Sequence, residues 1–378
     1  MVYGQYIVTS ARGSQFAGEG IKRKVYDQIA LLKRDSISCK LTVVYRESQD
    51  LRAKILEHYF PGAADSTAWD ISLIDQGSQF LYIRKPFYFS SDFISFLKKC
   101  KTKNPALVIY LEIPTYPYER EYSFKQLPML IKDLWNRRKL YKYVDYIVDL
   151  FGNKTLFGIP TIEIKNGIPV TDSSKRIPIK LGNQIRMICS ASFSPWHGID
   201  RLIKGMAKYY QHGGVRNICL TLVGSGDEIK KYKRLTKSLD LVDKVMFFDQ
   251  VPRDELRSFY NSCNLGVESL ARHRTGSKTP NSSLKSRDYL NAGLPFFGEG
   301  KVDVLTGTDF PYYLEISQSE LPIDMNDVID FFDSIYKDKD ETAIIDNIHD
   351  FAKRNDDLNM TFSGVIKAIE HEVEDRSD

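Results

Sequence analysis

Residues 218–229, Ile-Cys-Leu-Thr-Leu-Val-Gly-Ser-Gly-Asp-Glu-Ile, decide the fold class of this chain. The first six are apolar or β-branched and predict a strand, the two glycines predict a tight turn, and apolar residues at helical spacing over 228–239 predict a helix. Strand, turn and helix in this order form the repeating unit of a parallel α/β sheet. Ile229 replaces the third glycine of a dinucleotide fingerprint, so a tight turn is favoured over a nicotinamide-cofactor site.

The same alternation extends on both sides of this segment. In the second half, further strands are expected at 186–190, 244–248 and 265–270, and further helices at 199–210, 254–263 and 283–291. In the first half, strands are expected at 6–9, 41–45, 106–111, 146–150 and 161–164, and a helix at 25–33. Helical crossovers between strands require parallel sheets, so the expected fold class is α/β, with two Rossmann-like doubly wound domains facing one another.

Length and composition agree with two domains. The chain has 378 residues, more than one hydrophobic core usually organises, and its 42% hydrophobic and 27% charged residues exclude wholesale disorder. We expect a first domain over 1–170, a linker without hydrophobic period over 171–183, a second domain over 184–345 and a helical tail over 346–378 that crosses back to the first domain.

Charge, cysteines and hydropathy exclude several classes of function. Lys and Arg number 53 and Asp and Glu 49, a net charge of +4 that does not predict nucleic-acid binding. The five cysteines form no Cys-x-x-Cys pair, which is typical of reduced thiols in a cytosolic protein. No run reaches the roughly 20 apolar residues of a membrane span, and residues 1–10 do not resemble a secretion signal. Asp338-Lys339-Asp340 has an Asp-x-Asp spelling, but it lies in a charge-rich stretch and is not expected to bind a metal ion. We expect a cytoplasmic protein without a metal site.

Two segments combine a helix start with basic residues. Residues 193–201, Phe-Ser-Pro-Trp-His-Gly-Ile-Asp-Arg, follow a strand and open a helix, where free N–H groups and the helix dipole favour an anion. His197 would add a donor there; alternatively it only caps the helix. Residues 272–290 place a basic loop before a second helix, in which Asp288 would reach ribose hydroxyls beyond a phosphate, or merely pair with Lys285 on a solvated face. Phosphate and ribose together predict a nucleotide ligand.

Three stretches, 196–202, 222–226 and 283–295, resemble successive landmarks of the retaining family-4 glycosyltransferases, most closely bacterial capsule and exopolysaccharide members. The likeness covers most of residues 185–297, whereas the first domain is similar in outline. The resemblance implies the GT-B fold and a nucleoside-diphosphate sugar, UDP- or GDP-linked, that is bound mainly by the second domain without a metal ion or other cofactor.

The resemblance also assigns residues. Those implied to act on the diphosphate during catalysis are His197, Lys278 and Lys285. Those implied to bind the donor are Gly18 and Gly20 in the first loop, Gly224, Phe248 and Val251 near the base, Ser282, Ser283 and Leu284 at the distal phosphate and sugar, and Asp288 at the ribose. Pro280 replaces the first glutamate of the family motif, and Arg272, Arg274, Lys278 or Lys285 would supply the missing charge.

The function implied is transfer of the sugar, with retention, to a hydroxyl of a glycan acceptor, lipid-linked, in cell-surface polysaccharide biosynthesis. Displacement of the nucleoside diphosphate needs no protein nucleophile. A base among Glu112, Glu119, Glu121 or the nearby tyrosines is an option, although residues 109–114 are favoured as cleft wall. Two alternatives stay open, a nucleotide-sugar epimerase of the same fold and a non-catalytic partner of a true transferase.

Residues 124–147 carry an apolar stripe at helical spacing with basic flanks. The stripe consists of Leu127, Leu130, Ile131, Leu134 and Trp135, and the basic residues beside it are Lys132, Arg137, Arg138, Lys139 and Lys142. Such a helix would lie on an anionic membrane surface, making the protein peripheral to the inner face of the membrane. The alternative is an ordinary amphipathic helix packed against the first sheet.

Overall fold

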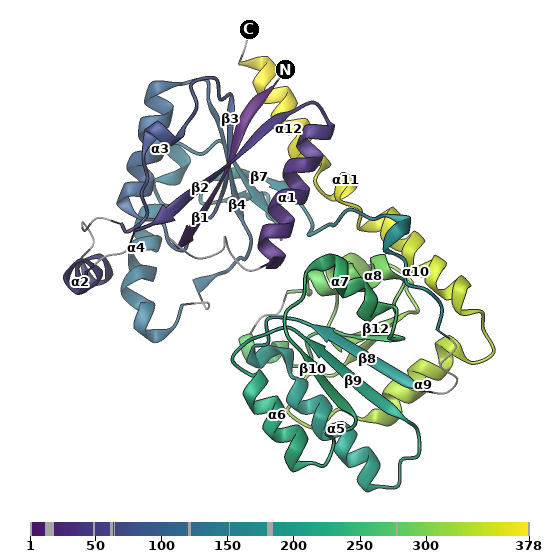
Figure 1. Ribbon diagram of the computed structural model, residues 1–378. Helices are drawn as coiled ribbons and strands as arrows, with labels where there is room; N and C mark the ends of the chain where they lie inside the picture. The colour runs from purple at the N-terminus through teal and green to yellow at the C-terminus, as the bar shows by residue number, and fades with distance from the viewer. Residues whose placement is uncertain are drawn as a thin grey trace. The chain divides into compact units, whose positions relative to one another are not determined.

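The computed structural model describes residues 2–11, 19–47, 50–60, 63, 65–119, 122–150, 152–179, 184–276 and 279–376. The chain divides into two compact units (Figure 1). Unit 1 contains Met1–Lys165 together with Leu358–Asp378, and unit 2 contains Asn166–Asp357. Each unit is built on a parallel sheet, so the expected fold class is confirmed.

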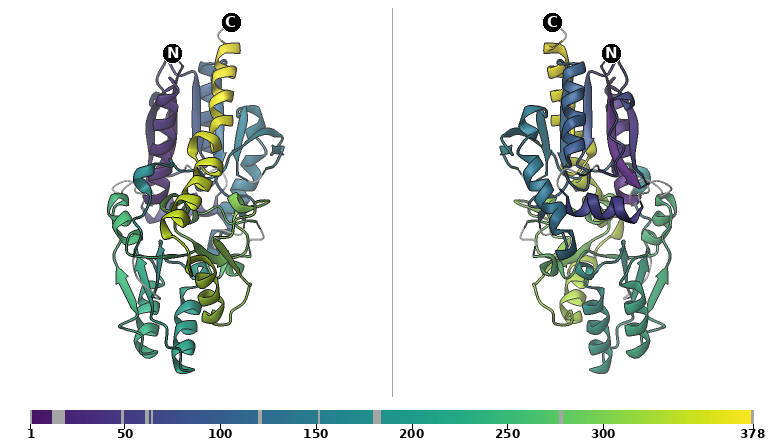
Figure 2. Two further views of the ribbon diagram at one scale, coloured as in Figure 1. Left: turned by 90° about the vertical axis from the view of Figure 1, so that its right-hand side faces the viewer. Right: turned by 90° about the vertical axis from the view of Figure 1, so that its left-hand side faces the viewer.

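Unit 1 has a sheet of order β2-β1-β3-β4-β5-β7-β6, parallel except for the pairing of β6 with β7. The strands are β1 (Tyr3–Ala11), β2 (Ser38–Arg46), β3 (Phe80–Arg84), β4 (Val108–Ile113), β5 (Tyr146–Asp149), β6 (Thr155–Leu156) and β7 (Ile159–Glu163). The helices are α1 (Glu19–Arg34), α2 (Leu51–Tyr59), α3 (Ser91–Lys103), α4 (Leu127–Arg137), α11 (Leu358–Thr361) and α12 (Ser363–Asp375). Residues of α1, α11 and α12 bury one face of the sheet, and residues of α3 bury the other (Figure 2).

Unit 2 has a fully parallel sheet of order β10-β9-β8-β11-β12-β13. The strands are β8 (Ile185–Ser190), β9 (Ile218–Val223), β10 (Val245–Phe248), β11 (Leu265–Val267), β12 (Phe296–Glu299) and β13 (Tyr313–Ile316). The helices are α5 (Ile199–Gln211), α6 (Ile229–Ser238), α7 (Arg253–Tyr260), α8 (Leu284–Ala292), α9 (Met325–Tyr336) and α10 (Glu341–Asn355).

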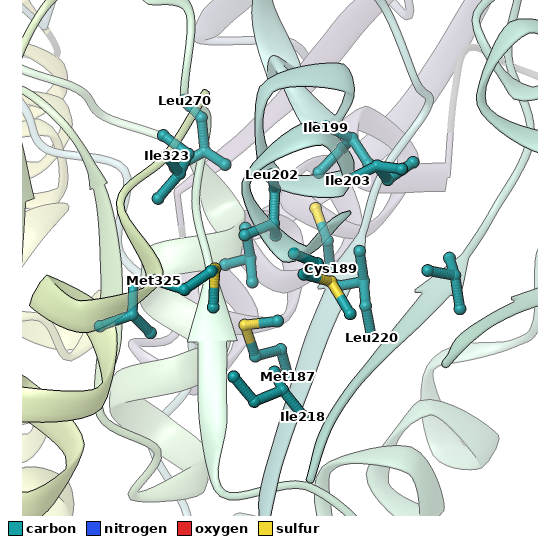
Figure 3. Packing of buried hydrophobic residues seen from close by; sticks show 14 of the residues in the cluster. Met187, Cys189, Ile199, Leu202, Ile203, Ile218, Leu220, Leu270, Ile323 and Met325 are labelled. Atoms are coloured by element: carbon teal, nitrogen blue, oxygen red, sulfur yellow. The ribbon is translucent and has the colours of Figure 1, made fainter. Parts of the chain in front are cut away.

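The core of unit 2 forms because alternate strand residues face a helix with an apolar stripe. Met187 and Cys189 of β8 and Leu220 of β9 pack against Leu202 and Ile203 of α5 (Figure 3). All five side chains are buried. Removal of a leucine, isoleucine or methionine side chain from water stabilises the fold by about 1.5–3 kcal/mol. This packing fixes α5, and with it the loop that precedes the helix.

The borders between the units differ from those expected. Unit 2 begins at Asn166 rather than after a linker over 171–183, because that segment is held by the second unit. The N–H of Val170 donates to the Asp357 carboxylate at 3.2 Å, and the N–H of Arg176 to the Ala292 carbonyl at 2.9 Å. Helix α10 also belongs to unit 2, so the tail returns to unit 1 at Leu358 and not at 346.

Candidate functional site

Unit 2 has a switch point in its strand order. Numbered by appearance, its strands lie in the order 3-2-1-4-5-6, so the order reverses between β8 and β11. Ligands of such sheets bind at the carboxyl ends of the strands, at this reversal. The loops after β8 and β11 are joined there, because the N–H of Leu270 donates to the His197 carbonyl at 2.9 Å and that of Ala271 to the Trp196 carbonyl at 3.1 Å.

Glu268, just after β11, is a buried carboxylate at this point that the sequence analysis did not single out. It accepts hydrogen bonds from the Asn281 side chain, the Ser283 hydroxyl and, at 2.9 Å, the Ser269 N–H. Its Oε1 lies 3.4 Å from the Lys285 Nζ. Burial alone would raise the pKa of Glu268, but the charge of Lys285 and the hydrogen bonds from Ser283, Ser269 and Asn281 together lower it, so the carboxylate is ionised.

Lys285 and His197, two of the three proposed catalytic residues, lie near Glu268, and their part in catalysis stays a prediction. Lys285 lies in the first turn of α8 and also donates to the Ser269 hydroxyl at 3.3 Å. Burial, followed by the positive charge of Lys285, lowers the pKa of His197 well below 6.5, so the imidazole is neutral. His197 Nδ1 lies 2.9 Å from the Ser194 nitrogen and 3.2 Å from the Ser194 carbonyl oxygen, so this ring nitrogen is engaged within its own turn. His197 thus offers a neutral ring, not a charge.

The start of α8 supplies backbone donors. Ser283 is the N-cap residue, and its side chain accepts from the Ser286 N–H. The N–H groups of the first helical turn, beginning at Leu284, point toward a negative ligand in such a geometry. Ser282 precedes the cap, and its carbonyl accepts from the Asn166 side chain at 2.8 Å. The structure therefore joins a helix start, one ammonium group and one neutral imidazole.

Gly224 has a packing role at the same edge of the sheet. Its φ is +133°, and a Cβ there would lie 2.1 Å from the carbonyl oxygen of Ala191. Gly226 meets Phe193 in the same way, with its added Cβ 2.4 Å from the Phe193 carbonyl oxygen. The two glycines let the loop after β9 approach the loop after β8, which favours the tight-turn interpretation; donor contact by Gly224 stays a prediction.

Gly224→Ala is expected to destabilise unit 2 by about 1–3 kcal/mol or more, because the backbone is strained for an L side chain and the Ala191 carbonyl must move. Urea unfolding followed by circular dichroism measures the loss. Gly213→Ala is a matched control, since it also has a positive φ, +84°, but nothing lies within 4 Å of its added Cβ. Equal losses in the two variants would contradict the packing argument.

Asp288 faces a different set of residues. It lines a cavity of about 310 Å³ within unit 2, together with Ser173, Leu256, Arg257, Tyr260 and Asn291, among others. Phe248 is half exposed, with its ring centroid 4.9 Å from that of Phe259. Val251 packs beside Leu256 and Phe259 in the cluster that covers this side of the sheet. Asp288 thus lies beside a cavity, and its contact with a ribose stays a prediction.

The other basic candidates are engaged in the fold. Arg274 holds Asp200 at 3.0 and 3.1 Å and Glu320 at 2.9 and 2.6 Å. Arg272 donates to the Thr279 carbonyl at 2.9 Å. Arg272 also feels the charge of Glu268, whereas Lys285 is the candidate in the described residues that forms an ion pair with it, at 3.4 Å.

Three of the expected residues lie outside the described residues, and a fourth is exposed. Gly18 and Lys278 lie outside the described residues, as does Glu121. Gly20 is exposed in the first turn of α1. Within the described ranges, no group of three or more His, Cys, Asp or Glu side chains is arranged to hold a metal ion.

Glu112 in unit 1 is unsuited to act as a base. It is fully buried at the end of β4, where it binds Lys24 Nζ at 3.0 Å, the Arg84 guanidinium, the Tyr82 hydroxyl at 2.7 Å and the Tyr6 hydroxyl at 3.3 Å. Burial raises its pKa, but Lys24 and then Arg84 outweigh that effect and lower the pKa to about 2. The carboxylate is therefore a structural anion.

Part of unit 2 is similar in sequence to a known protein family. Residues 170–270 match the sequence profile of the family described as "Glycosyl transferases group 1". This part of unit 2 is similar to a glycosyltransferase group 1 domain. The match includes His197, Gly224 and Glu268, and it confirms the expected enzyme class, a glycosyltransferase. Among curated proteins, no sequence matches the chain significantly.

Solved structures match nearly the whole chain. A glycosyltransferase from Rickettsia africae has a TM-score of 0.63 at 12% identity, with 98% of each chain covered. The Anabaena protein HepE in complex with UDP has a TM-score of 0.59 at 13% identity, with 98% of this chain and all of HepE covered. Sucrose-phosphate synthase from Thermosynechococcus elongatus has a TM-score of 0.61 at 12% identity, with 98% of each covered. These similarities confirm the two-domain GT-B fold.

Proposed function

We propose that the chain transfers a sugar from a nucleoside-diphosphate sugar to a hydroxyl of a lipid-linked glycan acceptor, with retention, in cell-surface polysaccharide biosynthesis. The observation that carries the proposal is the meeting of Lys285, His197 and the start of α8 at the switch point of a group 1 domain. UDP is favoured as the nucleotide over GDP because HepE, of the same fold, binds UDP and UDP-glucose.

The arrangement fits the charge that develops in this reaction. The bond between the anomeric carbon and the phosphate oxygen breaks, a bond from the acceptor oxygen forms, and negative charge grows on the leaving diphosphate. Lys285 Nζ and the N–H groups from Leu284 onward stabilise that charge, with the neutral ring of His197 as a further donor. The acceptor proton passes to the released diphosphate. No protein nucleophile takes part in this mechanism.

Glu268 is a positioning residue in this account. Both of its oxygens already accept hydrogen bonds from Asn281, Ser283 and Ser269, so it is not free to attack a sugar. Its charge instead holds the ammonium group of Lys285 at the first turn of α8. Removal of that charge would leave a partly buried cation without its partner.

Asp288→Asn is expected to weaken nucleotide binding about tenfold or more, because the neutral amide loses a charge-assisted hydrogen bond to a ribose hydroxyl. Calorimetric titration with UDP, GDP and their sugars measures the change. Asp243→Asn is a matched control, since this carboxylate is exposed just before β10 and does not belong to α8. No heat from any of these ligands with the wild-type protein would reject the proposed function.

Product analysis separates the alternatives. If the protein binds a nucleotide sugar and isomerises it without an acceptor, it is an epimerase. If it binds none and neither transfers nor hydrolyses a sugar, it is a partner subunit. Transfer to an acceptor that is lost in Asp288→Asn with an unchanged circular dichroism spectrum supports the transferase.

A further inference from the structure

Helix α4 has its apolar side in solvent and its polar side inside unit 1. Leu127, Ile131 and Trp135, spaced four residues apart, are 45%, 58% and 64% exposed. Lys132 and Asp133, on the opposite side, are 5% and 0% exposed. This is the reverse of a helix that covers a core, so the alternative in which the stripe packs against the first sheet is wrong.

Buried polar contacts fix α4 in this orientation. Asp133 accepts from the Phe89 N–H at 2.9 Å and from the Tyr118 hydroxyl at 2.6 Å. Asn136 donates to the Phe89 carbonyl at 3.0 Å. Rotation of the helix to bury Trp135 would break these bonds and leave polar groups without partners, which costs about 1–3 kcal/mol for each. The exposed stripe is therefore a property of the native fold.

Helix α2 extends the exposed apolar surface. Leu51, Ile55 and Tyr59 are spaced four residues apart along α2 and are all exposed. The two helices contact each other (Figure 1). Lys132 of α4 donates to the carbonyl oxygen of Glu57 in α2. We call the exposed side chains of residues 51–60 and 124–142 the α2–α4 surface.

The α2–α4 surface is basic as well as apolar. Its exposed cations are Arg52, Lys54, Lys125, Arg138 and Lys142. Neither of the acidic residues in these two segments is exposed, because Glu57 and Asp133 are buried. Lys132 and Arg137, expected among the basic residues beside the stripe, do not belong to this surface, because Lys132 is buried and Arg137 binds Glu119 at 2.7 Å.

We propose that the α2–α4 surface docks on an anionic lipid membrane. Leucine, isoleucine and aromatic side chains insert at the level of the lipid headgroups, and the surrounding ammonium and guanidinium groups pair with lipid phosphates. Exposed tryptophan and tyrosine beside cations suit this interface, since their rings are apolar at one end and polar at the other. The excess of positive charge selects an anionic surface over a neutral apolar partner. No described helix is long and apolar enough to cross a membrane, so attachment would be to the surface.

Sedimentation of the full chain with vesicles tests the proposal. One set of vesicles is phosphatidylcholine alone and the other contains phosphatidylglycerol. We expect binding to the second set and at least tenfold weaker binding to the first. A variant with Ile131→Ser and Trp135→Ser should lose binding at least tenfold, and since both side chains are exposed, its thermal midpoint should match the wild type.

Two triple variants with the same change in net charge show whether binding depends on the α2–α4 surface or only on the total positive charge of the protein. Lys54→Glu, Arg138→Glu and Lys142→Glu together should lower binding at least tenfold. Lys230→Glu, Arg234→Glu and Lys237→Glu on α6 change the net charge equally, also at exposed positions, and should leave most of the binding. Equal losses would overturn the proposal.

Two further outcomes would also overturn it. One is wild-type protein that stays in the supernatant with both kinds of vesicle. The other is a dimer, seen by analytical ultracentrifugation, that Ile131→Ser and Trp135→Ser dissociate, because the surface would then bind a second copy of the chain. Nucleotide titration of each variant keeps this result separate from the proposed function, which does not depend on the α2–α4 surface.

Discussion

Lys285→Gln is expected to lower the turnover of the nucleotide-sugar donor about 10²–10³-fold, the usual effect of removing one preorganised donor from developing negative charge. The ammonium group lies in the first turn of α8, so its charge adds to that of the free N–H groups where the diphosphate leaves. Because this charge grows mainly in the transition state, we expect kcat to fall more than KM rises.

The control for Lys285→Gln is Lys204→Gln, an exposed lysine on α5 in the same unit. It should retain wild-type turnover. Circular dichroism and the thermal midpoint show whether Lys285→Gln stays folded, since Glu268 loses its cationic neighbour. Turnover that is unchanged in a folded Lys285→Gln protein would exclude Lys285 from catalysis.

Glu112→Gln is expected to lower the free energy of unfolding of unit 1 by about 3–5 kcal/mol, because Lys24 and Arg84 would be left buried without their carboxylate. Both cations have less than a fifth of their side chains exposed, so water does not replace the lost partner. Urea unfolding at neutral pH measures the difference. Glu163→Gln on the exposed end of β7 is the control and should have little effect.

The same carboxylate predicts a pH dependence. The pKa of Glu112 is lowered from 4.5 to about 2 in the folded chain, so its stabilising effect is complete above about pH 4.5 and is lost as the pH falls toward 2. A difference of 4.5 − 2 = 2.5 units corresponds to about 3 kcal/mol. Unfolding measured from pH 6 to pH 2 should show a smaller decline for Glu112→Gln than for the wild type. Parallel declines would contradict the buried ion cluster.

The regular elements near the candidate site were predictable from sequence. The strand expected at 218–223 is β9 with the same bounds, and Gly293 ends α8 with a φ of +70° as its position suggested. Strands β3, β6, β12 and β13 were missed. Strands β3 and β12 are short and buried, so they lack the alternation that distinguishes a strand from a buried helix.

The site was predictable only in part. His197 and Lys285 follow helix-start patterns, and the structure brings them together. Glu268 had a weaker signal, a lone carboxylate after the apolar residues 265–267, and its partners Asn281 and Ser283 lie too far along the chain to be paired by pattern. For α4, periodicity reveals two faces but does not say which one the fold buries; the contacts of Asp133 decide that.

A structure of the protein soaked with UDP-glucose tests the central claim most directly. We expect the diphosphate at the start of α8, within hydrogen-bond distance of Lys285 Nζ and His197 Nε2, with the ribose hydroxyls at Asp288. A nucleotide bound elsewhere in the chain, or a diphosphate that contacts neither Lys285 nor the first turn of α8, would contradict it.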